Sequence, residues 1–316
     1  MTDAISLDKV CKRFGQKVAV DELSFTVPAG ALCGFIGPNG AGKTTTIRMI
    51  MSILLPDSGN LRVLGLPSAL AAKDRTGYLP EERGLYKKMK VGSFLRYLGR
   101  LKGLGGPSLD KRVRDWLEKV DLRDVERKRC EDLSKGMQQK LQFVVAVLHE
   151  PELLILDEPF SGLDPINMRL LRELIAEQHQ RGATIIFSTH VMVHAEQICD
   201  HILMIDEGRK VLDDTLANIR RRHDPRTILV EPLDSSSDPA LLRELPGVTD
   251  VSPNDDHYLV HLDEGFDVAT AIRDIVGRLD TARVEVQRPT LEDIFIQTVQ
   301  AGARRDRSRE LREALR

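Results

Sequence analysis

Eight consecutive residues near the N-terminus have the composition of a loop that wraps around phosphate groups. They fit the pattern G-x-x-x-x-G-K-[ST] and read Gly37-Pro38-Asn39-Gly40-Ala41-Gly42-Lys43-Thr44. The glycines let backbone amides approach phosphate oxygens, while Lys43 supplies a positive charge for the terminal phosphates. Thr44 would offer its hydroxyl to Mg²⁺. We therefore predict that this segment, extended by Thr45, binds the phosphates of a nucleotide; a glycine-rich turn without a ligand is the alternative.

Two acidic residues after an apolar segment supply a second part of a hydrolytic site. The segment Leu153–Leu156 is followed directly by Asp157 and Glu158. A buried strand here would place Asp157 beside Mg²⁺, where it acts through coordinated water, and Glu158 would polarise the attacking water as a general base. Taken alone, the pattern also fits a strand followed by a solvated turn. The phosphate loop upstream favours the hydrolytic interpretation.

A third segment lies between these two and predicts another anion-binding helix terminus. It reads Leu133-Ser134-Lys135-Gly136-Met137-Gln138-Gln139. Ser134 and the amides around Gly136 are expected at the start of a helix, where free N–H groups and the helix dipole favour an anion. The apolar face of that helix is predicted to consist of Leu141, Val144, Val145 and Leu148. An N-capped helix without a ligand is the alternative.

Alternating apolar and amphipathic segments indicate the elements that position these residues. Leu32–Ile36 is predicted to be a buried strand leading into the phosphate loop, and Thr45–Met51 the helix that follows. Ile185–Ser188 and Ile202–Ile205 are predicted strands of the same mixed or parallel sheet. From about residue 85 to 150 the pattern becomes helical, which indicates a helical subdomain inserted into the nucleotide-binding domain.

The three motifs in this order resemble the ATP-binding subunits of ATP-binding-cassette (ABC) transporters, over about residues 4–220. The usual signature of that family is Leu-Ser-Gly-Gly-Gln. Lys135 and Met137 depart from it, whereas Ser134 and Gly136 are retained. The resemblance implies ATP and Mg²⁺ as cofactors. It also implies a dimer in which Ser134, Lys135, Gly136 and Met137 of one copy face the ATP held by the phosphate loop of the other.

Several further positions take a role from the same resemblance. His190 matches a histidine that contacts the γ-phosphate, and it joins Lys43 and Glu158 as a catalytic residue. Asp164, in Ser161-Gly162-Leu163-Asp164, belongs to the dimer-interface loop. Phe14 falls where the family places an aromatic ring that stacks on adenine, with a core aromatic as the alternative. His190 and His194 are four residues apart, but no third metal ligand is evident.

Glu81 is a departure from the family, which commonly has glutamine at this position. A carboxylate can bind Mg²⁺, so Glu81 joins Thr44 and Asp157 as a predicted metal ligand, but it cannot donate a hydrogen bond as an amide does. The surrounding loop, Gly77-Tyr78-Leu79-Pro80-Glu81-Glu82-Arg83, could instead contact a membrane subunit through Glu82 or Arg83. An exposed charged loop with neither role is a further alternative.

Composition excludes several broad classes of protein. The 316 residues carry a formal net charge of −2, so there is no overall drive toward nucleic acid or anionic lipid. Four cysteines without paired spacing are expected to be reduced thiols. The N-terminal residues do not have the pattern of a signal peptide, and the apolar runs are shorter than the ~20 residues of a membrane helix.

The predicted fold is an α/β P-loop NTPase domain of the ABC type with a smaller α+β domain after it. The first domain spans residues 1–222, with the helical subdomain at about 85–150. A charged, proline-bearing break follows. Residues 226–299 have the order strand, helix, strand, strand, helix, strand of a ferredoxin-like module, then a helical segment at Thr290–Val299. Residues 300–316 form a basic tail.

The function that this resemblance implies is ATP binding and hydrolysis in an ABC transporter, with export favoured. The partners would be integral membrane permease subunits and a second ATPase subunit, in a homodimer or heterodimer at the cytoplasmic face of the cell membrane. The alternative is a soluble ABC-type ATPase acting on nucleic acid or ribosomes. Such proteins tend to carry two cassettes in one chain, whereas this chain has one. The predicted strands 227–231 and 258–262 carry a single aromatic residue, Tyr258, which does not support a base-stacking platform, so nucleic acid is a disfavoured partner.

Overall fold

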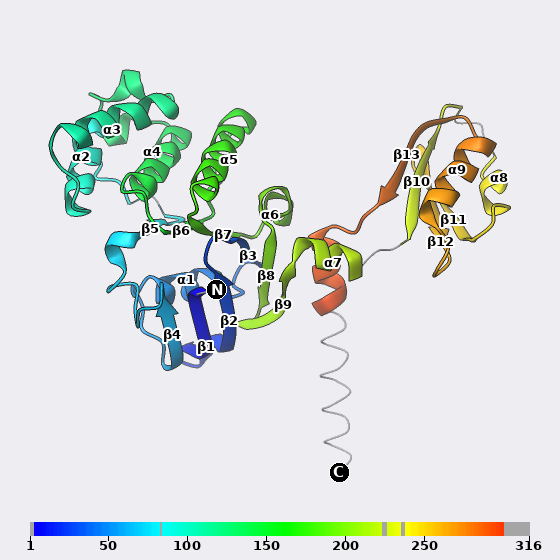
Figure 1. The fold of residues 1–316 in the computed structure, drawn as a ribbon, viewed down its shortest axis with the longest axis horizontal. Coiled ribbons are helices and arrows are strands. Elements are labelled where there is room, and N and C mark those ends of the chain that lie inside the picture. The colour runs from blue at the N-terminus through cyan, green and yellow to red at the C-terminus, as the bar shows by residue number, and fades with distance from the viewer. Residues whose placement is uncertain (1–2, 83, 223–225, 235–237, 300–316) are drawn as a thin grey trace, which may run out of the picture. The chain divides into compact units, whose positions relative to one another are not determined.

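The chain divides into two compact units, which meet in sequence at Leu216 (Figure 1). The computed structural model describes residues 3–82, 84–222, 226–234 and 238–299. The predicted basic tail, 300–316, lies outside the described residues, as does Arg83. The sequence pattern placed the boundary between residues 222 and 226, a few residues after the division seen in the structure.

The first unit contains a six-stranded sheet that positions both the phosphate loop and the acidic pair. Its strand order is β5-β6-β7-β3-β8-β9, with parallel pairing except between β8 and β9. Its central strands β6, β7 and β3 are buried at every residue and mostly apolar, because the sheet is covered on both faces. The strands are β3 (Leu32–Ile36), β5 (Thr76–Leu79), β6 (Leu153–Asp157), β7 (Thr184–Thr189), β8 (His201–Asp206) and β9 (Arg209–Thr215).

A smaller antiparallel sheet belongs to the same unit. Its order is β2-β1-β4, formed by β1 (Asp3–Phe14), β2 (Lys17–Pro28) and β4 (Ser58–Val63). Buried side chains of this sheet join those of β3, β6 and α1 (Lys43–Ile50) in one hydrophobic core. The core therefore fixes the helix that follows the phosphate loop against both sheets.

Helices between β5 and β6 confirm the predicted helical segment. They are α2 (Val91–Leu101), α3 (Gly106–Lys119) and α4 (Lys135–Val147), with short 3₁₀ turns at Arg123–Val125 and Cys130–Asp132. Trp116 of α3 packs edge-on against Phe143 of α4, with ring centroids 6.3 Å apart. The predicted apolar face of α4 was too narrow. Phe143 and Val147 are also fully buried, because α4 is covered on nearly all sides.

The remaining helices of the first unit follow strands of the six-stranded sheet. They are α5 (Pro165–Gln180) and α6 (Met192–Ile198), after β6 and β7. Cys11, Cys33, Cys130 and Cys199 are all free thiols, as predicted. No helix in the part of the chain that the structure describes combines the length and apolarity needed to cross a membrane.

The second unit contains the predicted ferredoxin-like arrangement. Its four-stranded antiparallel sheet has the order β11-β12-β10-β13, so the two central strands are the first and third along the chain. The helices α8 and α9 pack their apolar side chains on the core of this sheet. The elements are α7 (Leu216–Arg222), β10 (Thr227–Pro232), α8 (Ala240–Arg243), β11 (Val248–Asn254), β12 (His257–Leu262), α9 (Val268–Arg278) and β13 (Thr281–Gln287). Residues 291–299 are helical, which agrees with the predicted last segment.

Candidate functional site

A cavity of about 280 Å³ opens between the phosphate loop, the turn that joins β1 to β2, and Glu158, which directly follows β6. It brings together most of the residues predicted to bind nucleotide. Gly37, Pro38 and Ala41 belong to the same loop but do not line the cavity. The lining residues are Phe14, Lys17, Ala19, Asn39, Gly40, Gly42, Lys43, Thr44, Thr45, Glu81 and Glu158.

The phosphate loop has a backbone that only glycine allows at two positions. Gly42 caps α1 with φ = 103°, in the left-handed region. A Cβ atom on Gly37 would collide with the backbone carbonyl of Ile205. The loop therefore lies close to the neighbouring strand β8, and its glycines leave its backbone without side chains at these positions, as a phosphate-binding loop requires.

Lys43 begins α1 and is held inside the loop. Its Nζ donates hydrogen bonds to the carbonyl oxygens of Gly37 and Pro38, at 2.7 and 3.0 Å. Burial lowers the pKa of Lys43 below its usual value, and the negative charges of Glu158, Asp157 and Glu81 oppose that shift. These three carboxylates therefore lie near Lys43, the residue predicted to bind the terminal phosphates.

Asp157 fits the role of a metal-binding carboxylate. It is the last residue of β6 and is only 1% exposed, and neither of its carboxylate oxygens has a hydrogen-bond partner. Burial raises its pKa to about 6. The nearby Ser188 hydroxyl and the charge of Lys43 oppose this shift, and the charges of Glu81 and Glu158 add to it. Buried carboxylate oxygens without partners are costly unless a cation or water satisfies them. The residues present thus fit Mg²⁺, with Asp157 as one oxygen donor and the Thr44 hydroxyl as the second predicted donor.

Glu158 is held in a defined position by two residues at the end of the neighbouring strand β7. Its Oε2 accepts from the Thr189 hydroxyl at 3.0 Å, and its Oε1 accepts from the His190 amide at 2.8 Å. His190 Nδ1 lies 2.6 Å from the same Oε1. The backbone of Glu158 has φ = 49°, an uncommon value for a residue with a side chain. These contacts keep the carboxylate at the cavity although its backbone is strained.

The segment Ser134–Met137 is at the start of α4, as predicted, and does not line this cavity. The Ser134 hydroxyl caps the helix by accepting from the Met137 amide at 3.3 Å. Lys135 is exposed, whereas Gly136 and Met137 are half-buried. A phosphate contact by Ser134 within the same chain therefore has no support, and its contact with ATP stays a prediction for a second copy.

Asp164 caps the next helix. Its carboxylate accepts hydrogen bonds from the backbone N–H of Asn167 at 2.9 Å and from the side-chain Nδ2 of Asn167 at 2.6 Å. These bonds lower the pKa of Asp164. Gln139 of α4 connects the two segments by donating to the carbonyl oxygen of Pro159 at 2.9 Å. The start of α4 is thereby linked to the loop that leads from Glu158 to Asp164. Communication between two copies through Asp164 remains a prediction.

Phe14 is 49% exposed at the end of β1, so it is not the core aromatic that the alternative interpretation required. Lys17 faces it across the hairpin as its strand partner, and both side chains line the cavity. Sequence reasoning missed Lys17. The signal was its position: a lysine three residues after Phe14 in a tight turn must return beside that ring. The alternative of a His190–His194 metal pair gains no support, because the described residues contain no group of three metal ligands.

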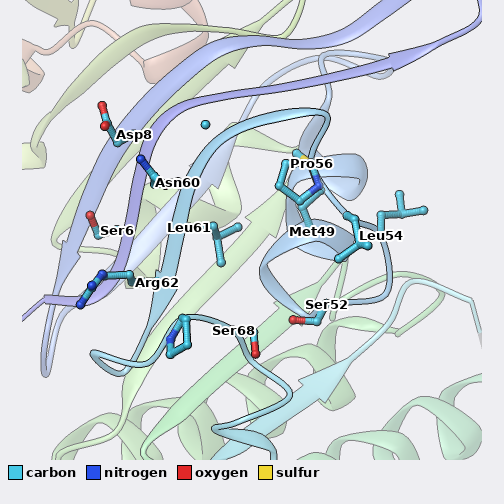
Figure 2. A pocket seen from close by; sticks show the side chains of 13 residues that line it. Ser6, Asp8, Met49, Ser52, Leu54, Pro56, Asn60, Leu61, Arg62 and Ser68 are labelled. Atoms are coloured by element: carbon cyan, nitrogen blue, oxygen red, sulfur yellow. The ribbon is translucent and has the colours of Figure 1, made fainter.

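A wider hollow of about 660 Å³ lies elsewhere on the first unit and holds none of the predicted site residues (Figure 2). Ser6 and Asp8 of β1 stand beside Asn60 and Arg62 of β4 on its polar side. It has no phosphate loop and no buried acid, so the phosphate chemistry belongs to the smaller cavity.

Sequence comparison agrees with this geometry. A family model described as "ABC transporter" matches residues 20–161, and one described as "ATP-binding protein DrrA1-3-like, C-terminal domain" matches residues 215–299. Over 298 residues the chain is 40% identical to YhaQ of Bacillus subtilis (strain 168), named an uncharacterized ABC transporter ATP-binding protein, and the match covers 94% of this chain and 99% of YhaQ. The chain belongs to the family of ABC transporter ATP-binding proteins.

Other ABC transporter ATP-binding proteins are similar over much of their length. The linearmycin resistance ATP-binding protein LnrL of Bacillus subtilis is 30% identical over 307 residues, covering 92% of this chain and 97% of LnrL. The Nod factor export ATP-binding protein I of Paraburkholderia xenovorans is 39% identical over 213 residues, covering 66% and 70%. A solved ATP-binding subunit of an ABC transporter has a TM-score of 0.65 at 32% identity, covering 69% of this chain and 92% of that one.

These matches confirm the predicted family and the α/β P-loop NTPase fold. The protein is the ATP-binding subunit of an ABC transporter. The alternative of an ABC-type ATPase acting on nucleic acid or ribosomes is not favoured.

Proposed function

We propose that this subunit hydrolyses Mg²⁺-ATP between two copies of the ATPase, each site combining residues of both. The observation that carries the proposal is the position of Glu158. Its carboxylate faces the same cavity as Lys43 and is oriented by Thr189 and His190. A carboxylate so held is placed to take the proton of an attacking water, because general bases act within hydrogen-bond reach.

The remaining residues take roles that follow from their positions. Lys43 and the loop amides bind the terminal phosphates, and Phe14 stacks on the adenine. Mg²⁺, when bound, neutralises phosphate charge, and Thr44 and Asp157 are the residues that would hold it. Ser134 and Gly136 are free to meet ATP in a second copy, since they do not line the cavity of their own chain.

The proposed partners are separate membrane permease subunits, and the proposed direction is export. Names of relatives support export: one is a Nod factor export protein and another a linearmycin resistance protein. An apolar patch on the helical segment is suited to contact a permease. Tyr86 packs edge-on against Tyr97, with ring centroids 5.8 Å apart, and both rings and Leu101 are exposed. The subunit would thus sit on the cytoplasmic face of the membrane, in a homodimer or heterodimer.

Mixing two inactive variants tests whether each site is shared. Lys43→Ala removes the phosphate lysine, and Gly136→Asp places a negative charge at the start of α4. The new side chain has room, because a Cβ atom on Gly136 would meet Leu163 at 3.5 Å, an ordinary contact. Each variant alone is expected to lose hydrolysis. A mixed dimer retains one intact site, so an equimolar mixture should recover roughly a quarter of wild-type phosphate release, by random pairing.

The control for this experiment mixes either variant with itself at the same total concentration. Full inactivity of the mixture, with both variants folded as wild type by circular dichroism and thermal melting, would show that ATP sites are not shared between copies. High activity of Gly136→Asp alone would contradict the role of the α4 terminus.

Phe14→Ala tests the adenine contact. Base–aromatic stacking contributes about 1–3 kcal/mol per base, so the KM for ATP should rise about 5–150-fold while kcat changes little. Stability should hardly change, because the ring is half exposed at a strand end. Phe14→Tyr serves as the matched control and should behave as wild type. An unchanged KM in Phe14→Ala, measured by phosphate release against ATP concentration, would assign the ring no part in binding.

A further inference from the structure

Two residues of opposite charge stand at two of the three positions where the chain departs from the usual motifs of its family. Glu81 replaces a glutamine and Lys135 replaces a glycine. Both side chains are exposed, and neither takes part in an ion pair or side-chain hydrogen bond within the described part of the chain. A single exposed charge of this kind is common on a protein surface. Here, however, one charge belongs to each half of the proposed shared site: Glu81 to the nucleotide cavity and Lys135 to the start of α4.

Glu81 lies at the terminal-phosphate end of the nucleotide cavity. It lines the cavity together with Lys43 and Glu158. Its negative charge acts on both Lys43 and Asp157: it opposes the burial that lowers the pKa of Lys43, and it adds to the burial that raises the pKa of Asp157. Glu81 and Glu158 therefore line the cavity beside Lys43, and the charge of the buried Asp157 also acts on that lysine. A triphosphate arriving there meets an excess of negative charge that Mg²⁺ and further cations must offset.

Lys135 is carried by the other half of the site. It is the first residue of α4 and stands between Ser134 and Gly136. This step rests on the proposed function: in the two-copy arrangement Ser134 and Gly136 approach the terminal phosphate of the other copy. The residue between them must then come close to the same end of the cavity. A lysine side chain reaches roughly 6 Å from its Cα when extended, so its ammonium can meet a carboxylate on the rim.

We propose that Lys135 of one copy and Glu81 of the other form an ion pair beside the bound ATP, one pair at each of the two sites. The pair exists only in the closed dimer. In a single copy the charge of Glu81 at the cavity has no ion-pair partner among the residues that the structure describes. In the dimer, the Lys135 ammonium of the second copy balances it. Closure on ATP is thereby favoured by a contact between the two chains in addition to their contacts with the nucleotide.

A double-mutant cycle tests the pair, with Glu158→Gln in every variant to prevent hydrolysis. The variants are Glu81→Gln, Lys135→Gln and the combination of both. The measurement is the dissociation constant of the ATP-dependent dimer, by light scattering or sedimentation at saturating ATP and Mg²⁺. Each single change should weaken the dimer by about 5–10-fold, and the double variant should be no weaker than the weaker single one. The coupling should shrink as salt is raised.

Matched controls are Glu118→Gln and Lys111→Gln, which remove exposed charges of α3 and should leave the dimer unchanged. Additive effects of Glu81→Gln and Lys135→Gln, or a dimer tightened by Glu81→Gln, would overturn the ion pair while the two-copy site stands. A parent Glu158→Gln protein that stays monomeric at saturating ATP would instead overturn the proposed function and the pair with it.

Discussion

Glu158→Gln is expected to lower ATP hydrolysis by about 10²–10⁴-fold, the range that a single general base contributes. The amide keeps the size of the carboxylate, and its one oxygen can still accept from the His190 backbone N–H, while its NH2 group then faces the Thr189 hydroxyl oxygen. It cannot take a proton from water. ATP binding should therefore be retained, and the variant should accumulate as an ATP-bound dimer that wild type passes through briefly.

Two measurements separate the loss of chemistry from a loss of binding. Phosphate release gives the rate, and light scattering with and without ATP gives the dimer. Glu173→Gln, an exposed acid of α5 paired with Arg169, is the matched control and should hydrolyse ATP as wild type. His190→Ala should lower the rate less than Glu158→Gln, since His190 orients the carboxylate. A Glu158→Gln variant with more than a tenth of the wild-type rate would assign the base elsewhere.

Much of the secondary structure around this site could be predicted from short segments, because the pattern of apolar residues within each segment fits only one kind of element. Leu32–Ile36 was predicted as a strand and is β3, since an all-apolar run between glycine-bearing turns has few other solutions. The second unit followed for the same reason: its alternating strands and amphipathic α9 specify the split βαβ order. The family resemblance then supplied the order of the three motifs.

Contacts between distant strands could not be read in the same way. The Glu158–His190 contact joins residues 32 apart and depends on β6 and β7 being parallel neighbours. The sequence of neither strand predicts that the two are paired. The same holds for Gln139, whose amide reaches Pro159 across the core, and for the breadth of the buried surface of α4. Such features are set by tertiary packing, which periodicity within one helix does not contain.

Asp157→Asn is expected to change stability and activity in opposite directions. The pKa of Asp157 is raised from 3.8 to about 6 by burial, so the folded chain disfavours the ionised carboxylate. Above pH 6 the ionised form costs the fold up to about 3 kcal/mol. The cost shrinks as the pH falls from 6 toward 4, because the folded chain then holds the proton. An uncharged asparagine of similar size removes this cost at neutral pH.

The stability measurement uses the apo protein without divalent cations. At pH 8 the variant should melt several degrees above wild type, and the two should converge near pH 4. Trp116 is the single tryptophan, and its fluorescence reports the unit that contains Asp157. A variant that melts below wild type at pH 8, or keeps its advantage at pH 4, would show that the buried carboxylate is not under electrostatic strain.

The activity measurement should show the reverse order. Without the carboxylate the site loses an Mg²⁺ ligand, so hydrolysis should fall at least 10²-fold and Mg²⁺-ATP should stabilise the variant less than wild type. Mg²⁺ binding to the wild-type subunit should weaken as the pH drops below about 6, because Asp157 of the metal-free site then takes up a proton that the metal must displace. Asp157 would then be a residue whose charge weakens the empty fold and is compensated only when the metal–nucleotide complex is bound, which couples the stability of the subunit to its ligand.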